Sequence, residues 1–217
     1  GPRADDLMEA VFADGVRAVR FFRFARFDFG GVSMAVARSG YSKQGGFEIY
    51  VEGAQHGMPL WNALMEAGKG MDVRAGCPNL IERIEGGLLS YGNDMTRENT
   101  PHECDLGKFC NAGPGIDHAG REALAQEAAT GPARQIRPIA IDGGPVVPCH
   151  QAWPVTDARG QRVGQVTSAT WSPDNDTNVA IGMIERSHWQ AGTGLQVHTP
   201  GGVRSAEVRA RFFHPVG

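Results

Sequence analysis

The chain has 217 residues, of which 41% are hydrophobic and 21% charged, with a formal net charge of -3. This composition is typical of a globular protein, and a slightly acidic chain has no general attraction for nucleic acid. No apolar run reaches the roughly 18 residues that span a bilayer. We therefore expect neither a nucleic-acid partner nor a membrane partner.

The cysteines and histidines show no spacing typical of a metal site. His102 and Cys104 flank Glu103, but no second cluster completes a ligand set, and no CxxC pair is present. We expect no bound metal, and reduced thiols that indicate a cytoplasmic protein. The four cysteines are Cys77, Cys104, Cys110 and Cys149.

The first part of the chain predicts helices interspersed with short strands. Apolar residues at helical spacing predict a helix over 3–13. Two runs, 16–24 and 32–38, predict a hairpin that turns near Gly30-Gly31. A further helix is expected over 59–67.

A glycine bend at residues 40–46 precedes a strand expected over 47–51. Alternation places Glu48 and Tyr50 on one face and the apolar residues on the other. Glu48 can be an ordinary solvated strand residue and Tyr50 a half-buried aromatic residue. Alternatively, the Glu48 carboxylate, which only accepts hydrogen bonds, can bind the N–H groups of a flat heterocycle beside the Tyr50 ring.

A short helix is expected over 79–85, ended by Gly86-Gly87. Arg83 on this helix can form an intrahelical or interdomain ion pair. It can also clamp a carboxylate tail, which the planar guanidinium suits. The glycines can simply end the helix or bring the backbone close to a ligand. An extended segment is expected over 88–93, followed by a loop over 95–104.

The second part of the chain changes character at Gly131-Pro132. Before it, a helix over 120–129 is expected with Asp117 as its N-terminal cap. Beyond it, short strands at even spacing predict an antiparallel barrel or sandwich. We therefore predict an α+β protein with domains at 1–131 and 132–217. The expected strands are 136–141, 146–147, 163–168, 178–184, 195–198 and 205–212.

Four segments together resemble the glycine-cleavage T-protein family, which consists of tetrahydrofolate-dependent aminomethyltransferases. The resemblance implies the later part of the folate-binding domains over 1–131 and the family's C-terminal barrel over 132–217. It also implies that an earlier part of the folate pocket lies outside the sequence, so that this chain alone would be nearly inactive. The segments are GYSKQGGFEIYV (40–51), RIEGGLLSYGND (83–94), DHAGREAL (117–124) and GQVTSATWSP (164–173).

The family's folate pocket implies roles for five residues of this chain. By matching position, Glu48 would hold the pterin N–H groups and Tyr50 would line the same pocket. Tyr41 would belong to its wall, while Arg83 and Asn79 would contact the folate tail. The resemblance implies no acid–base residue, since catalysis would consist of holding the reactants in line.

Two departures from the family pattern indicate a sulfonium-demethylating branch. Asn79 stands where the aminomethyltransferases have an arginine, and residues 43–46 read Lys-Gln-Gly-Gly in place of Gly-Glu-x-Gly. The branch implies transfer of a methyl group from dimethylsulfoniopropionate to N5 of tetrahydrofolate, giving methylmercaptopropionate and 5-methyltetrahydrofolate. Aminomethyl transfer and a non-enzymatic folate-binding role remain as alternatives. A homodimer is a further expectation.

Overall fold

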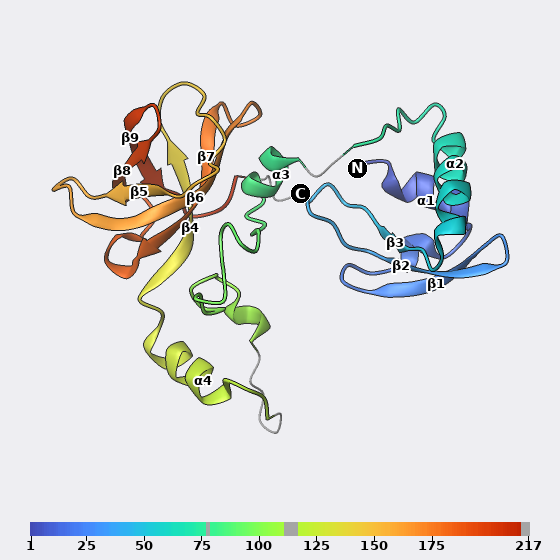
Figure 1. The fold of residues 1–217 in the computed structure, drawn as a ribbon, viewed down its shortest axis with the longest axis horizontal. Helices are drawn as coiled ribbons and strands as arrows, with labels where there is room; N and C mark the ends of the chain where they lie inside the picture. The colour runs from blue at the N-terminus through green and yellow to red at the C-terminus, as the bar shows by residue number, and fades with distance from the viewer. Residues whose placement is uncertain (77–78, 111–116, 214–217) are drawn as a thin grey trace. The chain divides into compact units, whose positions relative to one another are not determined.

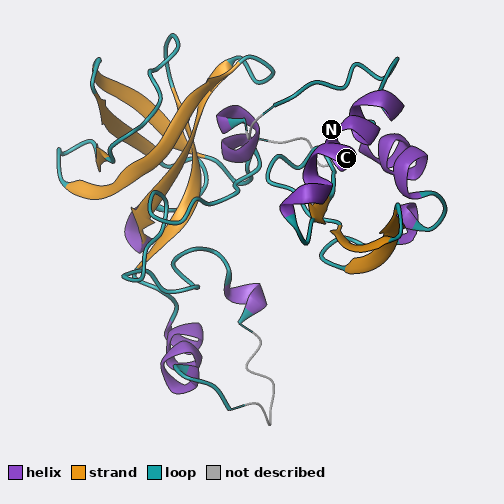
Figure 2. Ribbon diagram, turned by 45° about the vertical axis from the view of Figure 1, so that its right-hand side comes forward, coloured by secondary structure: helices purple, strands orange, loops and turns teal. Residues whose placement is uncertain are grey.

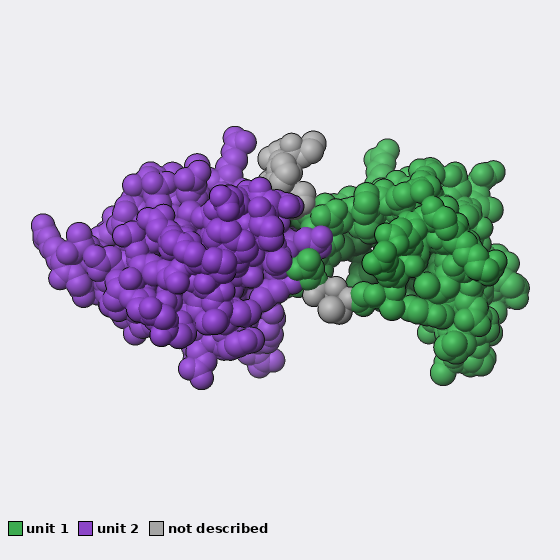
Figure 3. All heavy atoms as spheres, turned by 90° about the horizontal axis from the view of Figure 1, so that it is seen from above, with its two compact units in different colours: residues 1–79 green, residues 80–217 purple. Residues whose placement is uncertain are grey.

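The computed structural model describes residues 1–76, 79–110 and 117–213. The chain divides into two units, Gly1–Asn79 and Leu80–Gly217 (Figure 3). The domain boundary predicted at 131/132 stays a prediction. Helices and sheets occur in both units, which confirms the α+β class.

Unit 1 is a three-stranded antiparallel sheet with the order β1-β2-β3. Helices α1 and α2 lie on one face of the sheet, which we call the inner face (Figure 1). Met34 and Val36 of the central strand are fully buried there, against Met8, Phe12 and Leu60 of the helices. The elements are α1 (Ala4–Phe12), η1 (Val16–Ala18), β1 (Phe24–Phe29), β2 (Val32–Ala37), β3 (Glu48–Tyr50), η2 (Ala54–His56) and α2 (Gly57–Ala67).

The predicted hairpin is confirmed, but its first strand was placed too early. Residues 16–18 form a 3-10 turn after Gly15, where the backbone changes direction at a left-handed φ of 96°. Phe22 also has a positive φ, 59°, which a regular strand does not tolerate. The strand therefore begins at Phe24 and runs to the glycine turn.

Unit 2 contains a closed antiparallel barrel with the strand order β4-β7-β6-β5-β8-β9, in which β9 pairs with β4 (Figure 2). Aliphatic side chains such as Ile139, Val155, Val166 and Val197 fill its interior. The predicted barrel is thus confirmed. Its strands are β4 (Arg134–Ile141), β5 (Trp153–Thr156), β6 (Arg162–Ser172), β7 (Thr177–Glu185), β8 (Gly194–Thr199) and β9 (Gly202–Val208), with η4 (Arg186–His188) after β7.

Helix α3 (Leu80–Glu85) packs on the outside of the barrel, where Ile84 is fully buried against Ile136, Val179 and Ile181. The helix ends as predicted at its glycines: the Leu88 and Gly87 amides donate to the carbonyls of Arg83 and Ile84, with Gly87 at a φ of 66°. Two more helices of this unit are η3 (Gly107–Phe109) and α4 (Arg121–Thr130).

Several local predictions for unit 2 are wrong. Asp117 does not cap α4, because the N-cap is Gly120 at a φ of 80° with no side-chain hydrogen bond. Residues 146–147 are not a strand, since the Val146 amide donates to the Asn178 side chain and not to the backbone of a neighbouring strand. Residues 92–94 form a turn in place of an extended segment, and β9 ends at Val208. Strand β5 was missed.

Within the described ranges, no helix has the length and hydropathy required to cross a membrane.

Candidate functional site

The face of the unit 1 sheet opposite its helices, which we call the outer face, carries the two residues predicted to contact a ligand. The predicted alternation of β3 is confirmed: Ile49 points to the core, while Glu48 and Tyr50 are exposed. Tyr50 is 56% exposed and Phe24 of β1 is 70% exposed. Large aromatic groups on a surface of this kind are typical of a binding face.

The strand register sets two rows across this outer face. The first row runs Phe24–Ala37–Glu48, and the second runs Arg26–Ala35–Tyr50. The middle strand, β2, contributes only alanine to both rows. The larger side chains of β1 and β3 therefore flank a strip of small side chains over β2. A flat ring can therefore lie over β2 with the Glu48 carboxylate at one edge.

The glycine bend before β3 orients Glu48. The Ser39 hydroxyl donates a short hydrogen bond to the Glu48 carboxylate from the other end of the bend. Gly45 and Gly46 have φ values of 75° and 148°, which explains the glycines at these positions. Tyr41 lies in the same bend and is 40% exposed.

Asn79, the last residue of unit 1, has an exposed side chain. Arg83 is in unit 2, where its side chain is 8% exposed and forms a 2.9 Å ion pair with the buried Asp94. Its second terminal nitrogen donates to the Ser168 hydroxyl at 2.7 Å. The guanidinium is thus bonded inside unit 2, and its predicted contact with a folate tail stays a prediction, as does that of Asn79.

Asp94 is the centre of this buried network, and no local pattern in the sequence marks it as such. Thr167 and Ser168 both donate to its Oδ1, at 2.7 and 2.5 Å. Neighbouring strand residues normally point to opposite faces, but a β-bulge between Val166 and Ser168 turns both hydroxyls toward Asp94. Two of the family-like segments, 83–94 and 164–173, therefore meet at this network.

A second contact joins the same two segments. Glu85 is 6% exposed, and its carboxylate accepts a short hydrogen bond from the Ser172 hydroxyl. The carboxylate of Glu85 is also within 3.5 Å of the Asn175 amide nitrogen. These contacts indicate a structural role for the 83–94 segment, which fastens α3 to the barrel.

No group of three or more histidine, cysteine or acidic side chains in the described part of the chain could hold a metal. Glu103 instead binds Arg134 at 2.8 Å. Burial and the nearby Glu103 charge raise the pKa of Cys104 to about 11, and burial raises that of Cys149 to about 11. Cys77 lies outside the described residues.

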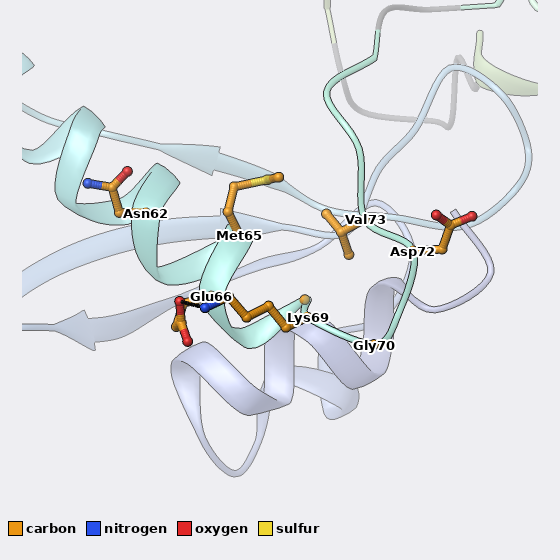
Figure 4. Close-up of a pocket in the computed structure, with 8 residues that line it drawn as sticks. Asn62, Met65, Glu66, Lys69, Gly70, Asp72 and Val73 are labelled. Atoms are coloured by element: carbon orange, nitrogen blue, oxygen red, sulfur yellow. Dashed lines mark ion pairs between the residues drawn. The ribbon is translucent and has the colours of Figure 1, made fainter.

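A cavity of about 560 Å³ lies at the C-terminal end of α2 (Figure 4). Met65 and Val73 contribute apolar surface to it, and a 2.6 Å ion pair joins Lys69 and Glu66 at its edge. None of the predicted ligand contacts lines this cavity. We therefore place the candidate site on the outer face of the sheet.

The fold defines a class of α+β proteins in which a helix-covered sheet precedes a six-stranded antiparallel barrel. Residues 1–113 match the family described as the GCVT N-terminal domain, and residues 134–214 match the glycine cleavage T-protein C-terminal barrel domain. The chain belongs to the glycine-cleavage T-protein family, which confirms the resemblance seen in the sequence.

Comparison with known proteins gives similar relatives of two kinds. The chain is 62% identical over 213 residues to "Dimethylsulfoniopropionate demethylase DmdA" of Ruegeria pomeroyi, covering 98% of this chain and 57% of that protein. It is 30% identical to the aminomethyltransferase of Saccharopolyspora erythraea, covering 99% of this chain and 58% of that protein. The chain thus spans somewhat more than half the length of these relatives.

A solved structure supports the fold. The crystal structure of the glycine cleavage system aminomethyltransferase T from Bartonella henselae superposes with a TM-score of 0.79 at 21% identity. The match covers 96% of this chain and 56% of that one.

Proposed function

We propose that the whole protein carrying this sequence is a tetrahydrofolate-dependent demethylase. It transfers a methyl group from dimethylsulfoniopropionate to N5 of tetrahydrofolate, leaving methylmercaptopropionate and 5-methyltetrahydrofolate. The observation that carries this proposal is the 62% identity to a dimethylsulfoniopropionate demethylase, against about 30% to aminomethyltransferases. The candidate site agrees with the chemistry.

The reaction requires little from the protein beyond position. The leaving group departs from a cationic sulfur as a neutral thioether, so it needs no general acid. The N5 amine of tetrahydrofolate supplies the nucleophile: the N5–C bond forms as the S–C bond breaks, and the N5 proton then passes to water. The protein must hold the sulfonium and the nucleophile in line. Holding two reactants in this way can lower the activation free energy by about 7–11 kcal/mol relative to the reaction in solution.

The residues of the outer face fit such a pair of reactants. Glu48 offers acceptors only, so it suits the N–H edge of a pterin ring. Tyr50 is two residues further on the same face, where its ring can attract a sulfonium through cation–π interaction. We propose Glu48 as the pterin anchor and Tyr50 as the wall that the two ligands share, with Tyr41 beside them.

Aminomethyl transfer is the second candidate, favoured by the many aminomethyltransferases among the relatives. The asparagine at position 79 weighs against it, since the aminomethyltransferase pattern has an arginine there. We further propose a cytoplasmic location, supported by the free thiols of Cys104, Cys110 and Cys149. A homodimer stays a prediction.

The test is a parallel assay of the whole protein with tetrahydrofolate. Dimethylsulfoniopropionate is supplied in one arm and the aminomethylated lipoyl substrate of the glycine-cleavage reaction in the other. We expect 5-methyltetrahydrofolate in the first arm and no turnover in the second. Turnover in the second arm alone would assign the protein to the aminomethyltransferases, and no turnover in either would support a binding role.

A further inference from the structure

Arg26 is the only cation among the strand residues of the outer face. The transfer of the methyl group itself does not require a positive charge at this position. Arg26 shares a register row with Ala35 and Tyr50. Its guanidinium extends across the middle strand: one terminal nitrogen donates to the Ser33 carbonyl at 3.2 Å and the other to the Glu52 carboxylate at 3.3 Å.

This contact holds the guanidinium on the same face of the sheet as the Tyr50 ring. Glu52 follows Tyr50 by two residues, just past the end of β3. Its ion pair with Arg26, a residue of the outer face, places the Glu52 carboxylate on this face as well. A positive charge therefore sits on the same side of the sheet as the aromatic ring, a short distance along the strand.

We propose that Arg26 binds the carboxylate of the methyl donor, which is a specificity-determining role. The inference rests on the proposed function, in which the donor is a sulfonium zwitterion. Its cationic sulfur and its carboxylate are joined by a two-carbon chain. With the sulfonium against Tyr50, the carboxylate points along the strand toward the position that the Glu52 carboxylate takes in this structure.

The energetics favour such an exchange of carboxylates. Arg26 and Glu52 have side chains that are 55% and 75% exposed, and an ion pair between groups this exposed is worth only about 0–1 kcal/mol. The substrate carboxylate can therefore displace Glu52 at small cost. It gains a planar partner that can bind both of its oxygens, which a lysine could not do.

The donor carboxylate is remote from the methyl group that moves. Arg26 should therefore bind the ground state and the transition state equally, so its loss raises KM and leaves kcat unchanged. A methyl donor without a carboxylate, trimethylsulfonium, should be indifferent to the substitution. This difference separates a carboxylate contact from a general disturbance of the sheet.

The experiment measures kcat and KM of the whole protein for dimethylsulfoniopropionate and for trimethylsulfonium, with tetrahydrofolate saturating. We expect Arg26→Gln to raise KM for dimethylsulfoniopropionate about 5-fold, with Arg26→Lys in between and kcat unchanged. Neither variant should change KM for trimethylsulfonium. The matched control is Arg209→Gln, which removes an equally exposed arginine (53%) from a 3.2 Å ion pair with Glu207 in unit 2.

An unchanged KM for dimethylsulfoniopropionate in folded Arg26→Gln would overturn the assignment alone, and so would an equal rise of KM for both donors. A wild-type protein that turns over neither donor would overturn the proposed function, and this assignment with it. The two failures are thus distinguishable.

Discussion

At the scale of single residues, burial decides what a carboxylate can do. Glu48 and Glu85 are both glutamates in family-like segments. Glu48 is exposed on the outer face beside Tyr50, and the Ser39 hydroxyl donates to it. Glu85 is buried against the barrel and bound by Ser172. Only the first is accessible to a ligand.

We expect Glu48→Gln to weaken tetrahydrofolate binding by the whole protein about 10- to 100-fold. The amide keeps the shape but lacks the charge, and a hydrogen bond to a charged group contributes about 1.5–3 kcal/mol. Calorimetric titration with tetrahydrofolate measures the change. The control is Glu66→Gln, a 70% exposed glutamate of α2 that pairs with Lys69. Equal affinities for wild type and a folded Glu48→Gln would remove Glu48 from the site.

The buried thiols make a second prediction at this scale. Only the thiolate reacts with iodoacetamide, and burial holds the pKa of Cys104 and Cys149 at about 11. At pH 8 we expect the half-buried Cys110 to be alkylated long before either of them, as peptide mass mapping would report. Rapid alkylation of Cys149 in the native state would contradict its burial.

The same raised pKa values affect stability at high pH. A thiol that keeps its proton in the folded state stabilises the fold at every pH below the ordinary value of 9.0. Its contribution to the free energy of unfolding is lost as the pH rises from about 9 toward about 11.

At the scale of elements, the sequence predicted those whose pattern is local. The alternation of β3, the helices α1 and α2, and the glycine stop of α3 all follow from residues close together in the chain. Strand β5 escaped prediction because it is short and contains Pro154, which disfavours a strand when read alone. Its pairing with β6 and β8 stabilises it, and that partner choice is not local.

In the candidate site, too, only the features that follow from a local pattern could be predicted. The outward direction of Glu48 and Tyr50 follows from a period of two. The row that places Arg26 and Tyr50 on either side of Ala35 depends on the register of three strands, which no local pattern fixes. Likewise, the Thr167 and Ser168 contacts with Asp94 depend on a β-bulge in β6 and join residues more than 70 positions apart in the chain.

The ion pair at Asp94 should be important for the stability of unit 2. Removing one partner of a buried pair leaves the other charge without compensation and costs about 3–5 kcal/mol. We expect Arg83→Met and Asp94→Asn each to lower the free energy of unfolding by about that amount, measured by urea denaturation. The double variant should cost less than the sum, whereas Arg209→Met, at an exposed pair, should change little. Additive effects would indicate that the pair is not coupled.

The end of α3 offers a sharper test of packing. A Cβ at Gly87 would lie 2.4 Å from the Phe212 ring, and the φ of 66° also disfavours alanine. Gly92 has a similar φ of 88° but open space around its Cα. We therefore expect Gly87→Ala to lower the thermal midpoint clearly more than Gly92→Ala. Combining Gly87→Ala with Phe212→Leu should recover part of the loss, and equal midpoints for both single variants would contradict the close contact.

At the scale of the whole molecule, the N-terminal boundary of the barrel unit differs between the sequence pattern and the packing. A boundary at 131/132 follows the change of character in the sequence and the start of the matched barrel domain at residue 134. The packing instead joins α3 and the Asp94 turn to the barrel, which places the division at 79/80. Ile84 alone buries a full aliphatic side chain there, worth about 1.5–3 kcal/mol.

We expect the fragment 80–217 to unfold cooperatively and the fragment 132–217 to be much less stable. Without residues 80–131, the outer apolar surface of Ile136, Val179 and Ile181 becomes exposed. Thr167 and Ser168 also lose the carboxylate that both of them bind. Urea denaturation followed by tryptophan fluorescence compares the two fragments, since Trp153, Trp171 and Trp189 belong to both.

The matched control is the fragment 132–217 carrying Ile136→Thr and Ile181→Thr. These changes make the newly exposed surface polar, so they should restore the solubility of the fragment but not its stability. If the fragment 132–217 unfolds with the same midpoint as the fragment 80–217, the barrel is an independent unit and the boundary at 131/132 is the correct one.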